Sequence, residues 1–181
     1  PLKKQYLEYL SESLKELNFL PKQWEFSNKL INKQFKKLSN NYICIHPISE
    51  NTQFNWTIEK WQHVITFVEK IGYKVVITGK GQRDLEFSNK LQKENPNIIN
   101  RVNELNWEGF VNILCNASVV ISVETVAGHI AALNQVPVIA LYFGQSNMDF
   151  WKPQGKNVTV FSPLYEIQPE KVTEKLKKYI L

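Results

Sequence analysis

A polar pair, Glu124-Thr125, stands between two segments of different periodicity, and its residue types suit the binding of an anion. Before it, the apolar run 119–121 is long enough for a buried parallel strand. After it, apolar side chains recur at helical spacing over 126–133, and a second apolar run follows at 136–143. The stretch therefore predicts two strands joined by a short helix, with a right-handed crossover.

The first turn of that predicted helix has the properties of a phosphate site. Its free N–H groups, around 125–128, point to the carboxyl ends of the strands, where open α/β sheets bind ligands. The small residues Ala127 and Gly128 would let a phosphate approach, and His129 would add a donor. The structural alternatives are that Thr125 only caps the helix and that His129 is a packed core histidine.

Other loops at the same ends of the predicted strands should line one crevice with this turn, namely 46–55, 79–84, 100–105 and 143–151. None of them is a phosphate-binding fingerprint. Gly79-Lys80-Gly81 begins the dinucleotide pattern, but Asp84 stands where its third glycine belongs, which argues against NAD(P). No P-loop pattern occurs either.

Short apolar strands alternate with helices along the rest of the chain. Strands are expected at 42–46, 74–78, 98–99 and 158–161, and helices at 57–71, 83–93, from about 103–106 to 116, and from 169 onward. This alternation predicts an α/β fold with a Rossmann-like, doubly wound parallel sheet over residues 41–181. Residues 1–40 read as a lead-in, with an amphipathic helix over 1–17.

Composition limits the partners. The formal charge of +5 comes almost entirely from lysine, since Arg83 and Arg101 are the only arginines, and this argues against nucleic acid. Contact with an anionic membrane surface stays open. Cys44 and Cys115 lie in apolar runs and are expected as free thiols in a reducing, cytoplasmic setting. The chain begins at Pro1 without a methionine, so we expect a piece of a longer protein.

The sequence offers no set of metal ligands. Asp84 and Asp149 are its only aspartates, so no Asp-x-Asp pair exists, and the three histidines lack ligand spacing. Charge on a bound diphosphate would then be balanced by the helix N-terminus and by cationic side chains. Lys80 and Lys152 are the candidates, and Lys152 is assigned to the diphosphate.

Three segments together resemble one family. They are His-Pro after the first strand, KVVITGKGQRD at 74–84, and the long stretch 103–146, which contains ETVAGHIAA at 124–132. They resemble the C-terminal half of heptosyltransferase-type glycosyltransferases, family 9, whose motif there is acid-Thr-Gly-Pro-x-His-x-Ala-Ala. That family builds lipopolysaccharide cores on a GT-B scaffold of two Rossmann-like domains. The resemblance covers roughly residues 42–162, and residues 1–40 are similar to the family's interdomain connection.

The resemblance implies a donor-binding role for the positions that match. The turn at Glu124 would present backbone amides and the Thr125 hydroxyl to the diphosphate of a nucleotide sugar of the ADP-heptose type, without metal or cofactor. The positions implied for the diphosphate are Glu124, Thr125, Val126, Ala127, Gly128, His129, Ser49 and Glu50. Those implied for the nucleoside are Asn103 beside the base, Asp84 at the ribose hydroxyls, and Gly79 in the same loop.

The same resemblance places the catalytic base, and a lipid-linked glycan acceptor, in the family's other half. This chain alone is therefore expected to contain no catalytic residue and to bind a donor without turnover, in the cytoplasm or at the inner face of its membrane. The chain departs from the family pattern at three places: Phe54 stands in the usual lysine position, Glu124 replaces aspartate, and Val126-Ala127 replaces Gly-Pro. A nucleotide-sugar epimerase on the same scaffold and a non-catalytic, degenerate binding module remain as alternatives.

Overall fold

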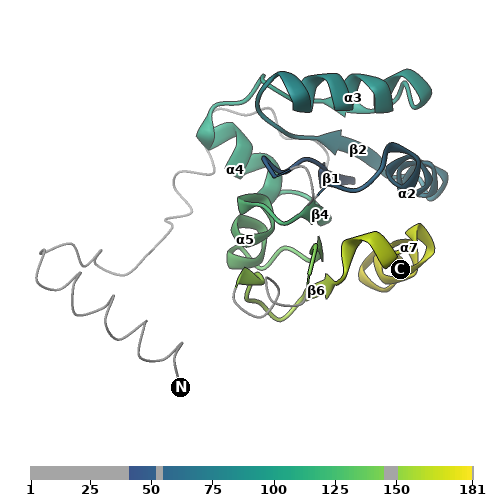
Figure 1. The fold of residues 1–181 in the computed structure, drawn as a ribbon. Coiled ribbons are helices and arrows are strands. Elements are labelled where there is room, and N and C mark those ends of the chain that lie inside the picture. Colours follow the sequence, from purple (N-terminus) through teal and green to yellow (C-terminus); the bar gives the residue numbers. More distant parts are fainter. Residues whose placement is uncertain (1–40, 52–54, 145–150, 181) are drawn as a thin grey trace, which may run out of the picture. The chain divides into compact units, whose positions relative to one another are not determined.

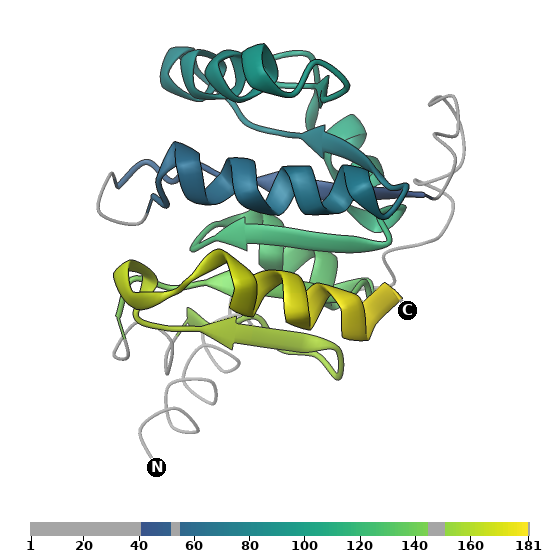
Figure 2. The ribbon, with the colours of Figure 1, turned by 90° about the vertical axis from the view of Figure 1, so that its right-hand side faces the viewer.

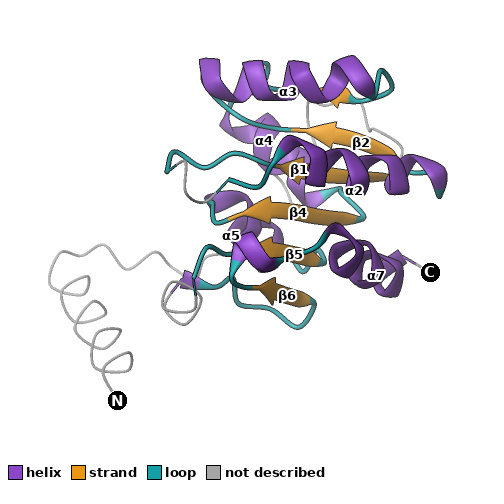
Figure 3. Cartoon of the chain, turned by 45° about the vertical axis from the view of Figure 1, so that its right-hand side comes forward, coloured by secondary structure: helices purple, strands orange, loops and turns teal. Residues whose placement is uncertain are grey.

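The computed structural model describes residues 41–51, 55–144 and 151–180, all within the compact unit Phe35–Leu181. Its strands are all parallel and form one six-stranded sheet in the order β3-β2-β1-β4-β5-β6 (Figures 1 and 3). The strands are β1 Tyr42–His46, β2 Lys74–Ile77, β3 Ile99–Asn100, β4 Val119–Val123, β5 Val138–Leu141 and β6 Val158–Phe161. This is the strand order of a Rossmann-like, doubly wound sheet, so the predicted fold class is confirmed.

The helices cover both faces of the sheet. On one face lie α2 (Ile58–Lys70), α3 (Gln82–Glu94) and α7 (Pro169–Ile180), which share one hydrophobic cluster with the strands. On the other face, α4 (Trp107–Cys115) and α5 (Val126–Leu133) contribute to a second cluster. Figure 2 shows α2 and α7 in front of the sheet, with α4 and α5 behind it. Burial from both sides explains why β5 is a continuous apolar run and why β4 is apolar except for Ser122.

Local signals fix most element boundaries. The Thr57 hydroxyl accepts a hydrogen bond from the Lys60 N–H at 3.4 Å and caps α2. The side chain of Asn106 caps α4 by accepting from the Gly109 N–H at 2.9 Å. Gly72, at φ +83°, ends the helical segment in a conformation that other residues rarely adopt.

The remaining boundaries differ from expectation by one or two residues. Of the predicted strand 136–143, the regular part is β5, and single backbone hydrogen bonds extend it at both ends: the Pro137 carbonyl accepts from the Val120 N–H, and the Tyr142 N–H donates to the Phe161 carbonyl. Pro137 itself has no N–H to donate. Helix α3 begins one residue early, after Gly81 at φ +107°. Residues 1–40 and Phe54, which carry the predicted lead-in helix and the departure from the family lysine, lie outside the described residues.

Two further observations concern the cysteines and the length of the helices. Cys44 is buried and Cys115 partly buried, and both are free thiols, as predicted. Among the described residues, no helix combines the length and apolar character needed to cross a membrane.

Candidate functional site

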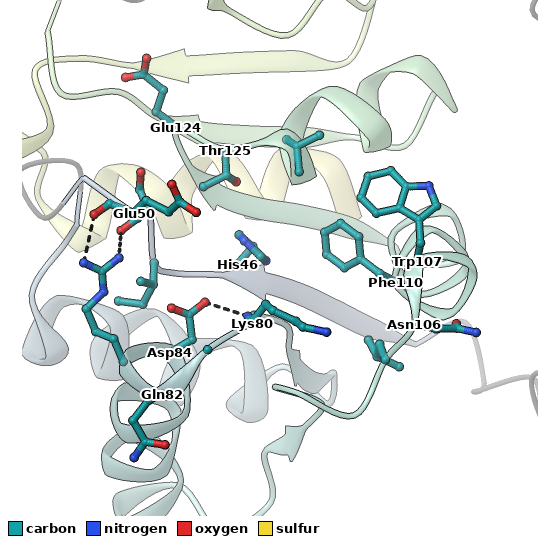
Figure 4. A pocket seen from close by; sticks show the side chains of 17 residues that line it. His46, Glu50, Lys80, Gln82, Asp84, Asn106, Trp107, Phe110, Glu124 and Thr125 are labelled. Carbon is teal, nitrogen blue, oxygen red and sulfur yellow. Dashed lines mark hydrogen bonds between the residues drawn. The ribbon is translucent and has the colours of Figure 1, made fainter.

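A cavity of about 830 Å³ lies at the carboxyl ends of β2, β1 and β4. The strand order reverses between β1 and β4, so the loops that follow these two strands leave in opposite directions. A crevice forms between them at the carboxyl ends of the strands. The volume is within the range of small-molecule sites. Figure 4 shows the lining side chains, which come from four loops: His46, Ile48, Ser49 and Glu50; Gly79, Lys80, Gly81, Gln82, Arg83 and Asp84; Leu105, Asn106, Trp107 and Phe110; Glu124, Thr125 and Val126.

The last residue of β1, His46, lines the cavity from the sheet. Its Nδ1 lies 3.0 Å from the hydroxyl oxygen of Thr78, and its ring lies 5.6 Å from that of Phe110, centroid to centroid. Burial lowers the pKa of His46 to about 4, so the imidazole is neutral at physiological pH. His46 is therefore packed and also faces the cavity as a neutral polar group.

The N-terminus of α5 forms part of the cavity wall. Thr125 occupies the N-cap position with extended backbone (φ −148°, ψ 169°), but its side chain makes no capping hydrogen bond. The hydroxyl instead donates to the Val123 carbonyl at 3.3 Å. The interpretation of Thr125 as a side-chain cap is therefore wrong, because the hydroxyl is turned back to its own strand. The Thr125 side chain therefore makes no hydrogen bond to the first-turn N–H groups of α5, and N–H groups at a helix N-terminus attract anions.

Ala127, Gly128 and His129 do not line the cavity. Ala127 is fully buried in the core. A Cβ at Gly128 would lie 2.9 Å from Ser122 Oγ and 3.3 Å from Pro153 Cγ, so the absence of a side chain there allows α5 to pack closely on β4. His129 is half-buried, which lowers its pKa, while a hydrogen bond with the Trp151 backbone opposes that shift. These residues hold the helix whose first turn faces the cavity.

The loop after β2 is braced by Asp84. Its Oδ2 accepts a hydrogen bond from the Lys80 N–H at 3.0 Å. A Cβ at Gly79 would lie 2.6 Å from the same oxygen, so glycine is required for this contact. Burial raises the pKa of Asp84, and the nearby Glu50 adds to this; the Lys80 N–H and the Arg83 charge oppose it. Asp84 thus stabilises the loop after β2 and also contributes a carboxylate to the cavity lining.

The loop after β1 is held by Arg83. Its Nη2 donates to the Ser49 carbonyl at 2.5 Å and its Nη1 to the Glu50 carbonyl at 3.0 Å. The Ser49 N–H donates to Asn55 Oδ1 at 2.6 Å, which fixes the same loop from the other side. Ser49 and Glu50, both predicted site residues, therefore lie in the cavity next to α3.

Asn103 and Lys152 lie elsewhere. Asn103, in the left-handed conformation at φ 64°, accepts from the Gly81 N–H at 2.7 Å and donates to the Gly81 carbonyl at 3.3 Å. It ties the loop after β3 to the loop after β2 without lining the cavity. Lys152 is exposed and is not among the lining residues.

Sequence reasoning missed the aromatic wall of the cavity. Trp107, the first residue of α4, is 62% exposed, and its ring lies 5.8 Å from that of Phe110. Leu105 and Val126 add apolar surface to the lining. The available signal was a tryptophan directly after the capping residue Asn106, in a loop that follows a strand. In Figure 4, Trp107 and Phe110 lie across the cavity from Glu50 and Asp84.

The cavity therefore has two chemically different sides. One offers aromatic surface, on which a planar ring can stack. The other offers the amides of α5, hydroxyl and carboxylate oxygens, and the Arg83 guanidinium, while the Lys80 side chain extends from beside Asp84 toward Asn106 (Figure 4). Fold and cavity together define a doubly wound, Rossmann-like domain with a ligand site at its topological switch point.

Comparison with known proteins gives the family. The profile of glycosyltransferase family 9 (heptosyltransferase) matches residues 2–180, so the chain belongs to this family, as the motif resemblance predicted. The chain is 28% identical over 148 residues to lipopolysaccharide heptosyltransferase 3 of Escherichia coli (strain K12), covering 79% of this chain and 43% of that protein. It thus spans less than half the length of this curated relative.

Solved structures share the fold. The E. coli ADP-heptose lipopolysaccharide heptosyltransferase II superposes with a TM-score of 0.73 at 22% identity, covering 90% of this chain and 56% of that one. The E. coli heptosyltransferase WaaC, solved with ADP, gives a TM-score of 0.69 at 19% identity, covering 77% of this chain and 44% of that one. At these identities the likeness concerns the fold.

Proposed function

We propose that this chain is the nucleotide-sugar-binding half of a glycosyltransferase of the ADP-heptose type, acting in the assembly of lipopolysaccharide or another surface glycan. The observation that carries the proposal is the cavity at the switch point, with the N-terminus of α5 on one side and an aromatic wall on the other. Family membership and the names of the relatives support the reaction class and the donor.

The two sides suggest how a nucleoside diphosphate would lie. Its base would stack on Trp107 and Phe110, where the cavity is aromatic. Its diphosphate would face the first turn of α5 and the Thr125 hydroxyl. The ribose would then lie between them, within reach of the carboxylate of Asp84. The neutral His46 below could donate or accept a hydrogen bond without adding charge.

The other half of the reaction would come from a partner domain. The chain covers under half of the curated relative, and we propose that the remainder of the protein supplies the catalytic base and the lipid-linked acceptor. The isolated chain would then bind a donor without transferring it. We place the enzyme in the cytoplasm, at the inner face of the membrane during transfer, because the two free thiols suit a reducing compartment.

We also propose that binding needs no metal ion. In the described part of the chain, no three metal-ligating side chains are grouped so that they could hold one. The amides of α5 and cationic charge in the cavity would instead stabilise the negative charge of the diphosphate.

The test is calorimetric titration of the chain with ADP, UDP, GDP and CMP, and then with the matching nucleotide sugars, with and without EDTA. Selective binding of ADP and ADP-sugars that EDTA leaves unchanged is the expected result. No binding at millimolar ligand by the folded chain would refute the donor-site assignment.

One observation favours the second candidate, a degenerate binding module. Val126, in the position of the family glycine, is 50% exposed and lines the cavity, where its side chain occupies space next to the first turn of α5. A full-length protein that binds ADP but releases no ADP from ADP-heptose in the presence of acceptor would support this candidate.

A further inference from the structure

We infer that the two cations of the cavity have separate tasks: Lys80 supplies the positive charge that binds the donor's phosphates, and Arg83 positions the loop after β1. Both side chains line the cavity, and they are the only lysine and arginine among its lining residues. This inference rests on the proposed function and names the charge that the phosphate end of the site needs.

The hydrogen bonds of Arg83 define its task. Its guanidinium donates through both terminal nitrogens to consecutive backbone carbonyls, those of Ser49 and Glu50. A planar fork with fixed geometry suits such a two-point contact, which lysine cannot reproduce. The contact joins segments 34 residues apart in the sequence and holds the loop after β1 on the first turn of α3. Arg83 is therefore a positioning residue.

The surroundings of Lys80 leave its ammonium group available. The backbone on either side is fixed, because the Lys80 N–H bonds Asp84 and the next residue, Gly81, bonds Asn103 through both its N–H and its carbonyl. The side chain is exposed, and no described residue forms a salt bridge or hydrogen bond with its Nζ. Figure 4 shows this side chain running from the side of Asp84 toward Asn106, below His46 in that view.

The charge balance of the cavity explains why a free cation is needed. Three carboxylates, those of Glu50, Asp84 and Glu124, line it against two cations, and a diphosphate adds further negative charge. The carbonyl contacts of Arg83 tie its charge to the rim formed by the loop after β1. The lysine that the family usually offers after the first strand is Phe54 here. Lys80 remains as the flexible cation that can follow the phosphates.

The experiment measures affinity for ADP and for adenosine, which share a base and ribose but differ in the phosphates. In the full chain, Lys80→Gln should weaken ADP binding by about 10- to 100-fold, the usual effect of losing a charge-assisted hydrogen bond, and leave adenosine binding unchanged. Lys80→Arg should retain most of the ADP affinity. Arg83→Gln should weaken ADP and adenosine by the same factor, since it disturbs the loop and not the phosphate charge.

Lys90→Gln is the matched control, because Lys90 is an exposed lysine of α3 that does not line the cavity. Thermal denaturation of every variant shows that each is folded. Equal ADP affinity in Lys80→Gln and wild type would overturn the inference, as would a loss in Arg83→Gln confined to ADP. Failure of the wild type to bind any nucleoside diphosphate would instead refute the proposed function itself.

Discussion

The packing of Gly128 on Ser122 predicts a coupled effect of two substitutions on stability. In Gly128→Ala, the new Cβ would lie 2.9 Å from Ser122 Oγ, closer than side-chain contacts normally are. Ser122 is fully buried, so the hydroxyl has little room to move. Overpacking of this kind costs about 1–3 kcal/mol, whereas alanine gains roughly 1 kcal/mol over glycine in a helix. We expect Gly128→Ala to lower the free energy of unfolding by about 1 kcal/mol.

In the presence of Ser122→Ala, the effect of Gly128→Ala on the free energy of unfolding should change from destabilising to stabilising. Ser122 Oγ is buried and has no hydrogen-bond partner among the described residues, so Ser122→Ala removes both the close contact and an unsatisfied polar group. In that background Gly128→Ala should stabilise the chain by up to about 1 kcal/mol, through helix propensity. The coupling energy would then be about 1–2 kcal/mol, within the range found for residues in contact.

Urea denaturation of the four proteins, followed by circular dichroism, measures this cycle. The contact at Pro153 Cγ, at 3.3 Å, is common to both backgrounds and cancels. Equal effects of Gly128→Ala with Ser122 and with Ala at position 122 would refute the reasoning that this close approach sets the position of α5.

Three further predictions concern the cavity. Trp107→Ala should weaken the binding of ADP and of adenosine by the same factor, roughly 5- to 100-fold in calorimetry, because aromatic–base stacking is worth about 1–3 kcal/mol. Trp107→Phe should recover part of this affinity. Unchanged affinity in Trp107→Ala would exclude stacking on this side chain. Thr125→Ala should weaken ADP binding while the midpoint of thermal unfolding stays within a few degrees, since the Thr125 hydroxyl caps no helix. Thr125→Ser, which keeps the hydroxyl, is the control. A large loss of stability in Thr125→Ala would contradict this prediction. The pKa of His46 is about 4 in the folded chain against an ordinary value of 6.5, so the unfolded chain binds more protons between these values and stability falls as pH drops through this window. Between pH 7 and pH 5 the free energy of unfolding, measured by urea denaturation, should fall by up to about 2 kcal/mol through this residue. The free energy of unfolding of His46→Gln should fall correspondingly less. Equal pH dependence of the two proteins would show that His46 is not buried as a neutral ring.

Much of the fold was predictable because parallel strands buried on both faces leave a strong signal. β5 is apolar throughout, β1 and β4 are apolar apart from His46 and Ser122, and the helices between them show their own periodicity. The rule that ligands bind at the carboxyl ends of the strands then brought Ser49, Glu124 and Thr125 to one cavity.

What the sequence could not supply were contacts between side chains and distant backbone. Arg83 bonds the carbonyls of Ser49 and Glu50, and Asn103 bonds Gly81, but neither contact follows from a local pattern. The orientation of a hydroxyl is equally inaccessible. Thr125 occupies an N-cap position with a residue that caps well, yet its hydroxyl donates to the preceding strand.

Three α5 positions expected at the diphosphate, Ala127, Gly128 and His129, do not line the cavity. The helix faces of Ala127 and Gly128 are turned to the sheet, where the small side chains permit close packing, and only the first residue of α5, Val126, lines the cavity. Conversely, Trp107 was overlooked because an isolated exposed tryptophan has no periodicity to reveal it.

The central claim is that a nucleoside diphosphate binds with its phosphates at the first turn of α5 and its base at Trp107. Proton–nitrogen correlation spectra of the labelled chain, titrated with ADP and with adenosine, test it most directly. We predict that ADP shifts the backbone amides of Val126 and Ala127, that adenosine leaves them in place, and that both ligands shift the Trp107 indole N–H. Equal shifts of the α5 amides by adenosine, or ADP-induced shifts confined to residues away from this cavity, would contradict the account.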